Sequence, residues 1–195
     1  MRKRIRHRVC QKDRGMSASA NLIRHPATDC DPIRRIGVEI SRTHDAITLS
    51  CRIEGEVSQL RIPVAGPAQR ADDLWQHSCF EAFLQADGGE GYVEFNFSPS
   101  GAWAAYRFSG RRSGRESPEL TAPRMEVRHG PDWLVMNIQC SLAGLAEFAH
   151  AAQVTAGLAV VIEDVRGGLS YWALAHSGAR PDFHDPATFT LRLPA

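Results

Sequence analysis

The chain has 195 residues, 43% of them hydrophobic and 23% charged, which suits one domain that buries its own core. No apolar run approaches the roughly 20 residues that cross a bilayer, so we expect no membrane insertion. The formal net charge is only +1, which argues against a nucleic-acid-binding protein with a strongly basic surface.

The basic residues are concentrated at the N-terminus. Residues 1–15 contain seven Lys or Arg and one acid, Asp13, but no apolar segment of a secretory signal. The remaining residues carry 16 basic and 21 acidic side chains, a net charge of −5. We interpret residues 1–15 as a disordered basic extension or as a mis-assigned start that precedes Met16. A single domain is expected over residues 16–195.

The five cysteines are scattered, and no two of them form a CxxC pair. This spacing is typical neither of a disulfide framework nor of a zinc site. We therefore expect reduced thiols and a cytoplasmic protein. Cys51 and Cys79 lie in strand-like patterns and are predicted to be buried.

Hydrophobic and polar residues alternate through most of the chain after residue 30, which predicts β-strands. The first strands are expected at residues 36–40 and 47–53. Gly55 is expected to turn the chain into a hairpin partner at residues 57–64.

The centre of the chain is predicted to be a three-stranded meander, at residues 75–84, 92–98 and 102–108. The polar, Gly- and Ser-rich residues 110–118 follow as a loop that we expect to be mobile.

Five further strands complete the pattern, at residues 124–128, 133–140, 155–164, 169–176 and 189–193. Only residues 141–151 have helical periodicity, with Ser141 as a candidate N-cap. The sequence therefore predicts an all-β protein, a two-sheet sandwich of about ten strands with one short helix.

Polar side chains share one face of the strand predicted at residues 92–98. Tyr92, Glu94 and Asn96 lie there, opposite a purely hydrophobic face. Carboxylate and carboxamide groups can bind neighbouring hydroxyls in pairs, which suits a polyol or a sugar. The alternative is that this face is the solvated side of an edge sheet.

The strand predicted at residues 75–84 places Trp75, His77 and Glu81 on one face. Glu81 would be costly to bury alone, so we expect it to face water or to be neutralised by an arginine such as Arg107. Trp75 and Trp172 stand near loop-rich ends and are the candidates for stacking on a ligand.

Three stretches of the chain resemble the bacterial DOMON-like domain proteins, which are related to the family 9 carbohydrate-binding modules. They are residues 73–83, residues 92–108, and residues 170–174 with 181–184. The resemblance covers about residues 20–195 and implies an immunoglobulin-like β-sandwich. Its sugar-binding branch implies that Trp75 and Trp172 stack on a sugar while Glu94, Asn96 and Arg107 hold its hydroxyls.

The full set of candidate ligand-binding residues is Trp75, His77, Glu81, Glu94, Asn96, Trp103, Arg107, Trp172 and His176. The main hypothesis is a non-catalytic binding domain for a small polyhydroxylated ligand. No cofactor is expected under that hypothesis.

Other functions stay open. The family's haem branch uses a Met and a His, and the candidates here are Met125, Met136, His77, His129 and His176. A metal site is conceivable at His176, Asp182, His184 and Asp185, and a calcium site at Glu163 and Asp164. An enzyme could use Glu81, Glu94 or His77 as acid and base. None of the common hydrolase, protease or nucleotide-binding motifs is present. A role in binding a partner protein is the last alternative.

Overall fold

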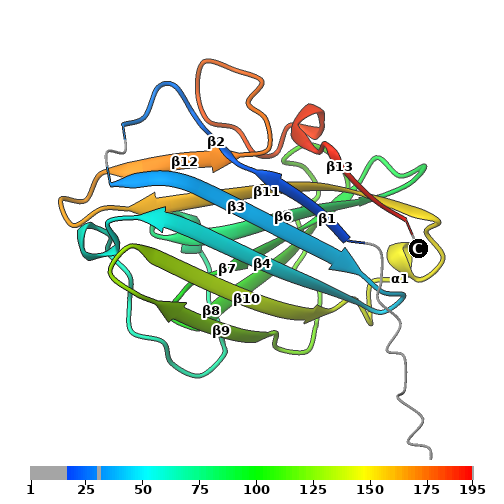
Figure 1. The fold of residues 1–195 in the computed structure, drawn as a ribbon. Coiled ribbons are helices and arrows are strands. Elements are labelled where there is room, and N and C mark those ends of the chain that lie inside the picture. The colour runs from blue at the N-terminus through cyan, green and yellow to red at the C-terminus, as the bar shows by residue number, and fades with distance from the viewer. Residues whose placement is uncertain (1–16, 30–31, 195) are drawn as a thin grey trace, which may run out of the picture.

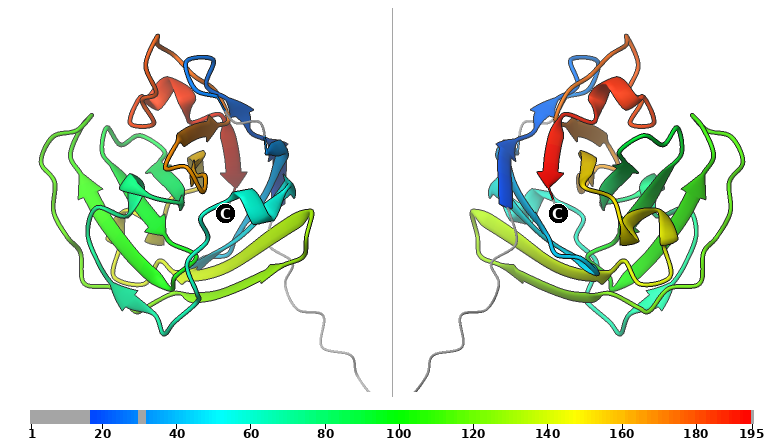
Figure 2. Two further views of the ribbon diagram at one scale, coloured as in Figure 1. Left: turned by 90° about the vertical axis from the view of Figure 1, so that its left-hand side faces the viewer. Right: turned by 90° about the vertical axis from the view of Figure 1, so that its right-hand side faces the viewer.

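The computed structural model describes residues 17–29 and 32–194. Two β-sheets form the two layers of a sandwich (Figures 1 and 2). The first sheet has the order β1-β3-β4-β10-β9, with β1 at Ser17–Asn21, β3 at Ile33–Arg42, β4 at Ala46–Gly55, β10 at Trp133–Ser141 and β9 at Arg124–His129.

The second sheet has the order β2-β12-β11-β6-β7-β8-β5, and β13 also pairs with β11. Its strands are β2 (Ile23–Arg24), β12 (Leu169–Ala173), β11 (Gln153–Glu163), β6 (Cys79–Ala86), β7 (Tyr92–Phe97), β8 (Ala102–Phe108), β5 (Gln69–Arg70) and β13 (Leu191–Pro194). The helical elements are the helix α1 (Ala146–Ala149) and the short 3-10 turns η1 (Val57–Gln59), η2 (Leu74–Gln76) and η3 (Pro186–Thr188). The predicted all-β sandwich is thus confirmed.

Three local predictions were wrong. The helix does not begin after Ser141, which ends β10; α1 begins at Ala146, with Leu145 at its N-cap. Residues 57–64 are not a hairpin strand: they form η1 and a single bridge from Leu60 to Asp164. Pro63 has no amide hydrogen to donate to a ladder, which disfavours a strand there. Residues 75–78 precede β6 instead of belonging to it, because Asp73 adopts a left-handed backbone conformation and η2 follows it.

The main core lies between the two sheets. Alternate residues of the meander point into it, such as Phe80 on β6 together with Phe95 and Phe97 on β7, and each is at most 1% exposed. They meet Ile, Leu and Val side chains of β3, β4 and β10. Burying this apolar surface is the main stabilisation of the fold.

A second hydrophobic cluster covers the opposite, outer face of the second sheet. It contains Phe83, Tyr92, Phe108, Phe183 and Phe189. Gly157 on β11 lets the Phe189 ring pack directly against the strand, because a Cβ atom at Gly157 would come within 2.4 Å of that ring.

The strand β7 lies between β6 and β8, and Tyr92 and Glu94 on its outer face are buried. The alternative that this face is the solvated side of an edge sheet was therefore wrong.

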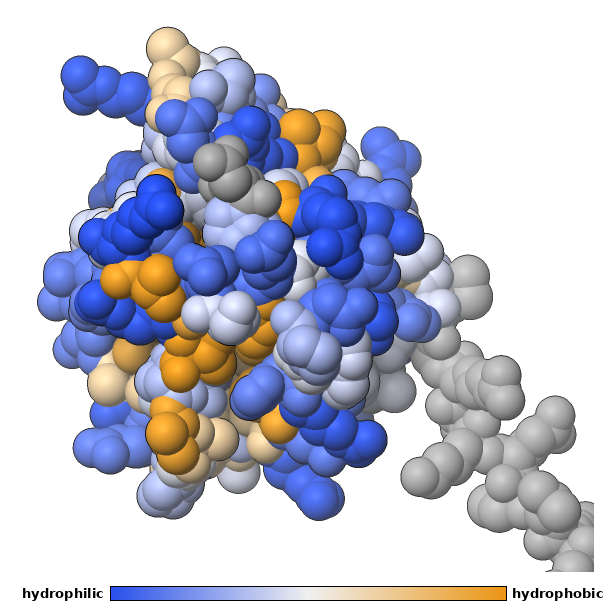
Figure 3. Space-filling model, turned by 60° about the vertical axis from the view of Figure 1, so that its left-hand side comes forward, coloured by the Kyte–Doolittle hydropathy of each residue, from blue (hydrophilic) through white to orange (hydrophobic). Residues whose placement is uncertain are grey.

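Large hydrophobic side chains are sparse on the surface. Within the described residues, those exposed are Ile23, Val64, Trp75 and Val165. Figure 3 shows one face, on which hydrophobic groups are small and separated by hydrophilic side chains. In the described segments, no helix combines the length and apolar character required to span a membrane. Trp75 is the one aromatic side chain among these four described residues, and it lines a pocket.

Candidate functional site

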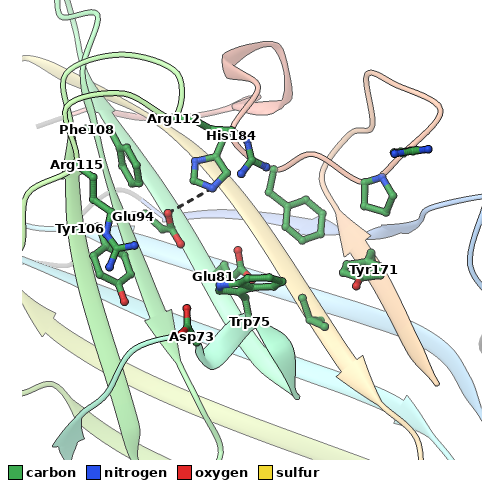
Figure 4. A pocket seen from close by; sticks show the side chains of 14 residues that line it. Asp73, Trp75, Glu81, Glu94, Tyr106, Phe108, Arg112, Arg115, Tyr171 and His184 are labelled. Atoms are coloured by element: carbon green, nitrogen blue, oxygen red, sulfur yellow. Dashed lines mark ion pairs between the residues drawn. The ribbon is translucent and has the colours of Figure 1, made fainter. Parts of the chain in front are cut away.

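A pocket of about 630 Å³ opens on the outer face of the second sheet, over β6, β7, β8, β11 and β12 (Figure 4). Its volume lies within the range of roughly 300–1,000 Å³ that small-molecule sites occupy. Two glutamate carboxyl groups, the Asp73 carboxyl group, a set of aromatic rings and three arginines line it.

The two carboxyl groups belong to adjacent strands, Glu81 to β6 and Glu94 to β7. The strand register pairs Phe83 with Glu94, so Glu81 and Glu94 are diagonal neighbours on the same face. Such neighbours have Cα atoms roughly 7–8 Å apart, which brings long side chains within reach of each other. Both are nearly inaccessible, at 4% and 5% exposure, so their charge states depend on the groups around them.

Hydrogen-bond donors surround Glu94. The Asn96 amide donates to its Oε1 at 2.6 Å, and the His184 Nε2 lies 3.6 Å from its Oε2. The other ring nitrogen of His184, Nδ1, is 2.7 Å from the Tyr92 hydroxyl. Burial raises the pKa of Glu94, while Asn96 and the nearby Arg115 and Arg112 oppose that rise. These groups offset the effect of burial only in part, so the pKa of Glu94 stays above its usual value.

Glu81 has the opposite environment. Its Oε1 is buried, and no polar atom of the described residues lies within hydrogen-bonding distance of it. Burial, reinforced by the Glu94 carboxylate, raises the pKa of Glu81 well above its usual value, with Arg112 opposing. Glu81 therefore favours its protonated form more strongly than Glu94 does. It neither faces water nor pairs with Arg107, so those two expectations were wrong, and the arginine that acts on it is Arg112.

The raised pKa of Glu81 predicts a pH-dependent gain in stability for Glu81→Gln. The unfolded chain releases this proton near pH 4.5, while the folded chain keeps it. The wild-type protein therefore loses about 1.4 kcal/mol of unfolding free energy for each pH unit above 4.5, up to the folded pKa. Glutamine cannot ionise, so the variant avoids this loss.

Urea unfolding of both proteins at pH 4, 6 and 8 measures the effect. We expect the advantage of Glu81→Gln to grow with pH, whereas Glu90→Gln, an exposed change next to β7, should show no such trend. A constant difference between wild type and Glu81→Gln would contradict the assignment.

Aromatic rings form the walls of the pocket. Tyr106 and Phe108 come from β8, Tyr171 from β12, and Phe183 from the loop before η3. Trp75, 48% exposed, stands on η2 beside Glu81 in Figure 4. Trp75 is the exposed ring among them, and the aromatic walls and buried carboxyl groups together give the site apolar surfaces and directional polar groups.

Two loops at the rim have strained backbones. Asp73 has φ 58° and Arg112 has φ 54°, and no other non-glycine residue of the described segments has a positive φ. Left-handed conformations are uncommon for such residues, and outliers of this kind cluster at functional sites.

The arginines of the loop after β8 are held in place at the pocket. The Arg112 guanidinium donates to Asp182 at 3.0 Å, and the Arg115 guanidinium lies 4.1 Å from the Tyr106 ring centre. Arg111 also donates to Asp182, at 2.5 Å. The loop expected to be mobile is thus tied to the segment after β12.

Four of the predicted site residues lie at or under the pocket. Trp75, Glu81 and Glu94 line it, and Asn96 supports Glu94 from below. Four of the nine predicted residues thus come together at one pocket, and their role in binding stays a prediction.

Three predicted residues point to the other face of the sheet, and their assignment was wrong. Trp103 and Trp172 are 4% and 6% exposed and belong to the core between the sheets. Arg107 forms a bidentate ion pair with Glu147 at 2.8 and 3.0 Å, away from the pocket. Each of the three lies an odd number of positions from a pocket residue on the same strand. Because side chains alternate between the two faces of a sheet, theirs point to the inner face.

The two predicted histidines lie outside the pocket lining. His77 contacts the Glu163 carboxylate through Nδ1 at 2.8 Å. His176 contacts the Ile23 carbonyl through Nε2 at 2.8 Å and packs edge-on against His25.

No family model and no curated protein matches this sequence. Among solved structures, the chain is similar to a protein from Bacteroides uniformis to which carbohydrate binding has been provisionally ascribed. The match has 14% identity, covers 92% of this chain and 86% of that one, and has a TM-score of 0.64. A family 9 carbohydrate-binding module from Caldicellulosiruptor kristjanssonii, in complex with cellotriose, matches with 10% identity, 89% and 80% coverage, and a TM-score of 0.52.

The fold is that of the family 9 carbohydrate-binding modules. At these identities the likeness shows the fold alone. Within this module-type sandwich, the pocket uses the outer face of the second sheet.

The candidate haem and metal ligands lie as follows in the described residues. Met136 is fully buried in the core, and Met125 packs against it from β9. Across residues 17–29 and 32–194, no three His, Cys, Asp or Glu side chains approach as metal ligands do. Asp182 and Asp185 instead both face Arg111.

Sequence reasoning missed most of the aromatic wall and all three arginines. Tyr106 and Phe108 could have been found, because the tight turn before β8 sets their register against Glu94 and Tyr92. No local pattern identifies Arg112, Arg115 and Arg180, since loop conformation and long-range contacts place them.

Proposed function

We propose that this chain binds a carbohydrate in the pocket on the outer face of its second sheet, as a relative of the DOMON-like domain proteins. The observation that carries the proposal is the pair of buried carboxyl groups, Glu81 and Glu94, in the same pocket as the exposed indole of Trp75.

A sugar ring matches this arrangement chemically. Its C–H face is apolar and can cover an aromatic side chain, while its rim carries adjacent hydroxyls. Glu94 would accept from hydroxyl groups, and Glu81, whose pKa burial raises the further of the two, would donate to an oxygen of the ring. Arg112 and Arg115 can donate to further hydroxyls at the rim.

The fold neighbours support the same ligand class. One is a module in complex with cellotriose, and carbohydrate binding has been provisionally ascribed to the other. Both likenesses cover about nine tenths of this chain, so the proposal concerns the whole sandwich.

The proposal is tested by glycan-array screening of the purified protein, followed by calorimetry with D-glucose, D-galactose, D-mannose, D-xylose and cellobiose. We expect saturable binding of at least one saccharide. Absence of binding across the array and these sugars would reject the proposal.

Trp75→Ala is expected to weaken the bound saccharide's affinity by about tenfold, because the ring loses its aromatic platform. Stability should change by no more than about 0.5 kcal/mol, since Trp75 is a surface side chain. Calorimetry and urea unfolding measure the two effects. The matched control is Val64→Ala, at a more exposed hydrophobic residue outside the pocket lining, which should leave affinity unchanged. Unchanged affinity in Trp75→Ala would show that the indole does not contact the sugar.

A further inference from the structure

The Glu81–Glu94 pair is built asymmetrically, and sugar binding alone does not require the asymmetry. Two hydrogen-bonding carboxylates would bind hydroxyls well. Here Glu94 accepts a hydrogen bond from Asn96 and has the His184 ring 3.6 Å away, whereas the buried Oε1 of Glu81 has no hydrogen-bond partner among the described residues. Neighbouring titratable groups whose environments separate their protonation states are a mark of acid–base pairs.

The geometry points to a reaction: we propose that the Glu81–Glu94 pair interconverts the anomers of a bound reducing sugar, with Glu81 as the acid and Glu94 as the base. This inference rests on the proposed function, because the sugar must first occupy the pocket.

The reaction requires no cofactor and no other reactant. The Glu94 carboxylate takes the proton of the anomeric hydroxyl, and that oxygen becomes a carbonyl oxygen. The C1–O5 bond breaks, its electron pair moves to O5, and O5 takes the proton of the Glu81 carboxyl. After rotation about C1–C2, O5 attacks the other face of the carbonyl carbon. Glu81 regains its proton from O5, and Glu94 returns its proton to the anomeric oxygen, so both groups are restored.

The spacing of the pair suits these transfers. The anomeric oxygen and the ring oxygen are bonded to the same carbon, so the acid and the base must reach neighbouring atoms. Diagonal neighbours on one sheet face provide this reach. The aromatic walls cover the site, which strengthens the electrostatic influence of each carboxyl on the other.

Asn96 and His184 act as positioning residues for the base. The Asn96 amide fixes Glu94 Oε1, and His184 lies at the other oxygen, Oε2. Burial and the nearby Arg112 lower the pKa of His184 to about 4, so its ring is a weaker proton acceptor than Glu94, whose pKa is raised.

Polarimetry tests the inference on the intact protein. Freshly dissolved single anomers of D-glucose, D-galactose, D-mannose and D-xylose relax to equilibrium at a known background rate in dilute buffer. We expect the wild-type protein to accelerate the relaxation of the sugar that it binds. General acid–base groups contribute typically about 10²–10⁴-fold, so Glu94→Gln and Glu81→Gln should each lower the catalysed rate constant by at least about 100-fold.

The two variants are distinguished by binding. Glutamine at position 81 can donate the same hydrogen bond but cannot transfer a proton, so Glu81→Gln should keep its calorimetric affinity while losing rate. Glu90→Gln, exposed and outside the pocket lining, is the matched control and should keep both.

The outcomes separate the two proposals. Saccharide binding in calorimetry without accelerated relaxation in the wild type overturns the acid–base inference and leaves the binding function standing. Acceleration that survives in both variants also overturns it. Absence of both binding and acceleration contradicts the proposed function together with this inference.

Discussion

Trp172→Ala is expected to lower the free energy of unfolding by about 3–5 kcal/mol, the usual cost of removing a buried aromatic side chain. Trp172 is 6% exposed and faces the core between the sheets, opposite Val160 of β11. Its indole nitrogen also donates to the buried Ser170 hydroxyl at 3.1 Å, and the truncation leaves that hydroxyl unpaired. Urea unfolding measures the loss.

Trp75→Ala is the matched control, because it removes the same side chain from an exposed position. We expect Trp172→Ala to lower stability and Trp75→Ala to lower saccharide affinity. If Trp172→Ala kept full stability but lost binding, the indole of Trp172 would have to face the ligand, and the placement of β12 would be wrong.

Glu94→Gln is expected to weaken saccharide binding by roughly 10–100-fold. Hydrogen bonds to a charged group contribute about 1.5–3 kcal/mol, and each 1.4 kcal/mol is a factor of ten in affinity. Glutamine keeps the size of the side chain, and its amide oxygen can still accept from Asn96, so the fold should persist. Calorimetry with the saccharide selected by the array measures the change.

Glu147→Gln provides the control for that experiment. Glu147 pairs with Arg107, a residue that sequence reasoning assigned to the site and the structure places away from it. We expect unchanged affinity. A loss comparable with that of Glu94→Gln would return Arg107 to the site and contradict the strand register of β8.

The fold could be predicted because strand alternation is a local property. In β7 the alternate residues Val93, Phe95 and Phe97 were predicted to face the core, and they do. Tyr92, Glu94 and Asn96 were correctly placed on the opposite face. Alternation does not say which face of a doubly covered sheet carries a site, because both faces of β7 are buried.

The errors arose where the answer depends on pairing between strands. Trp172 and Tyr171 are neighbours, and only the register against Val160 and Val161 of β11 shows that Tyr171 faces the pocket. Arg107 could have been excluded, since it lies between Tyr106 and Phe108, whose register against β7 follows from a tight turn. Arg112 and Arg115 depend on loop contacts with no sequence period.

The two hydrophobic clusters lie on opposite faces of the second sheet, so substitutions on one face need not disturb packing on the other. In β6 and β7, residues that contribute to the folding core alternate with residues that contact the pocket or its cover. Substitutions at Glu81, Glu94 and Tyr106 therefore leave the contacts between the two sheets intact. One scaffold can acquire new ligands through changes at every second position of a few strands, while the intervening positions preserve its thermodynamic stability.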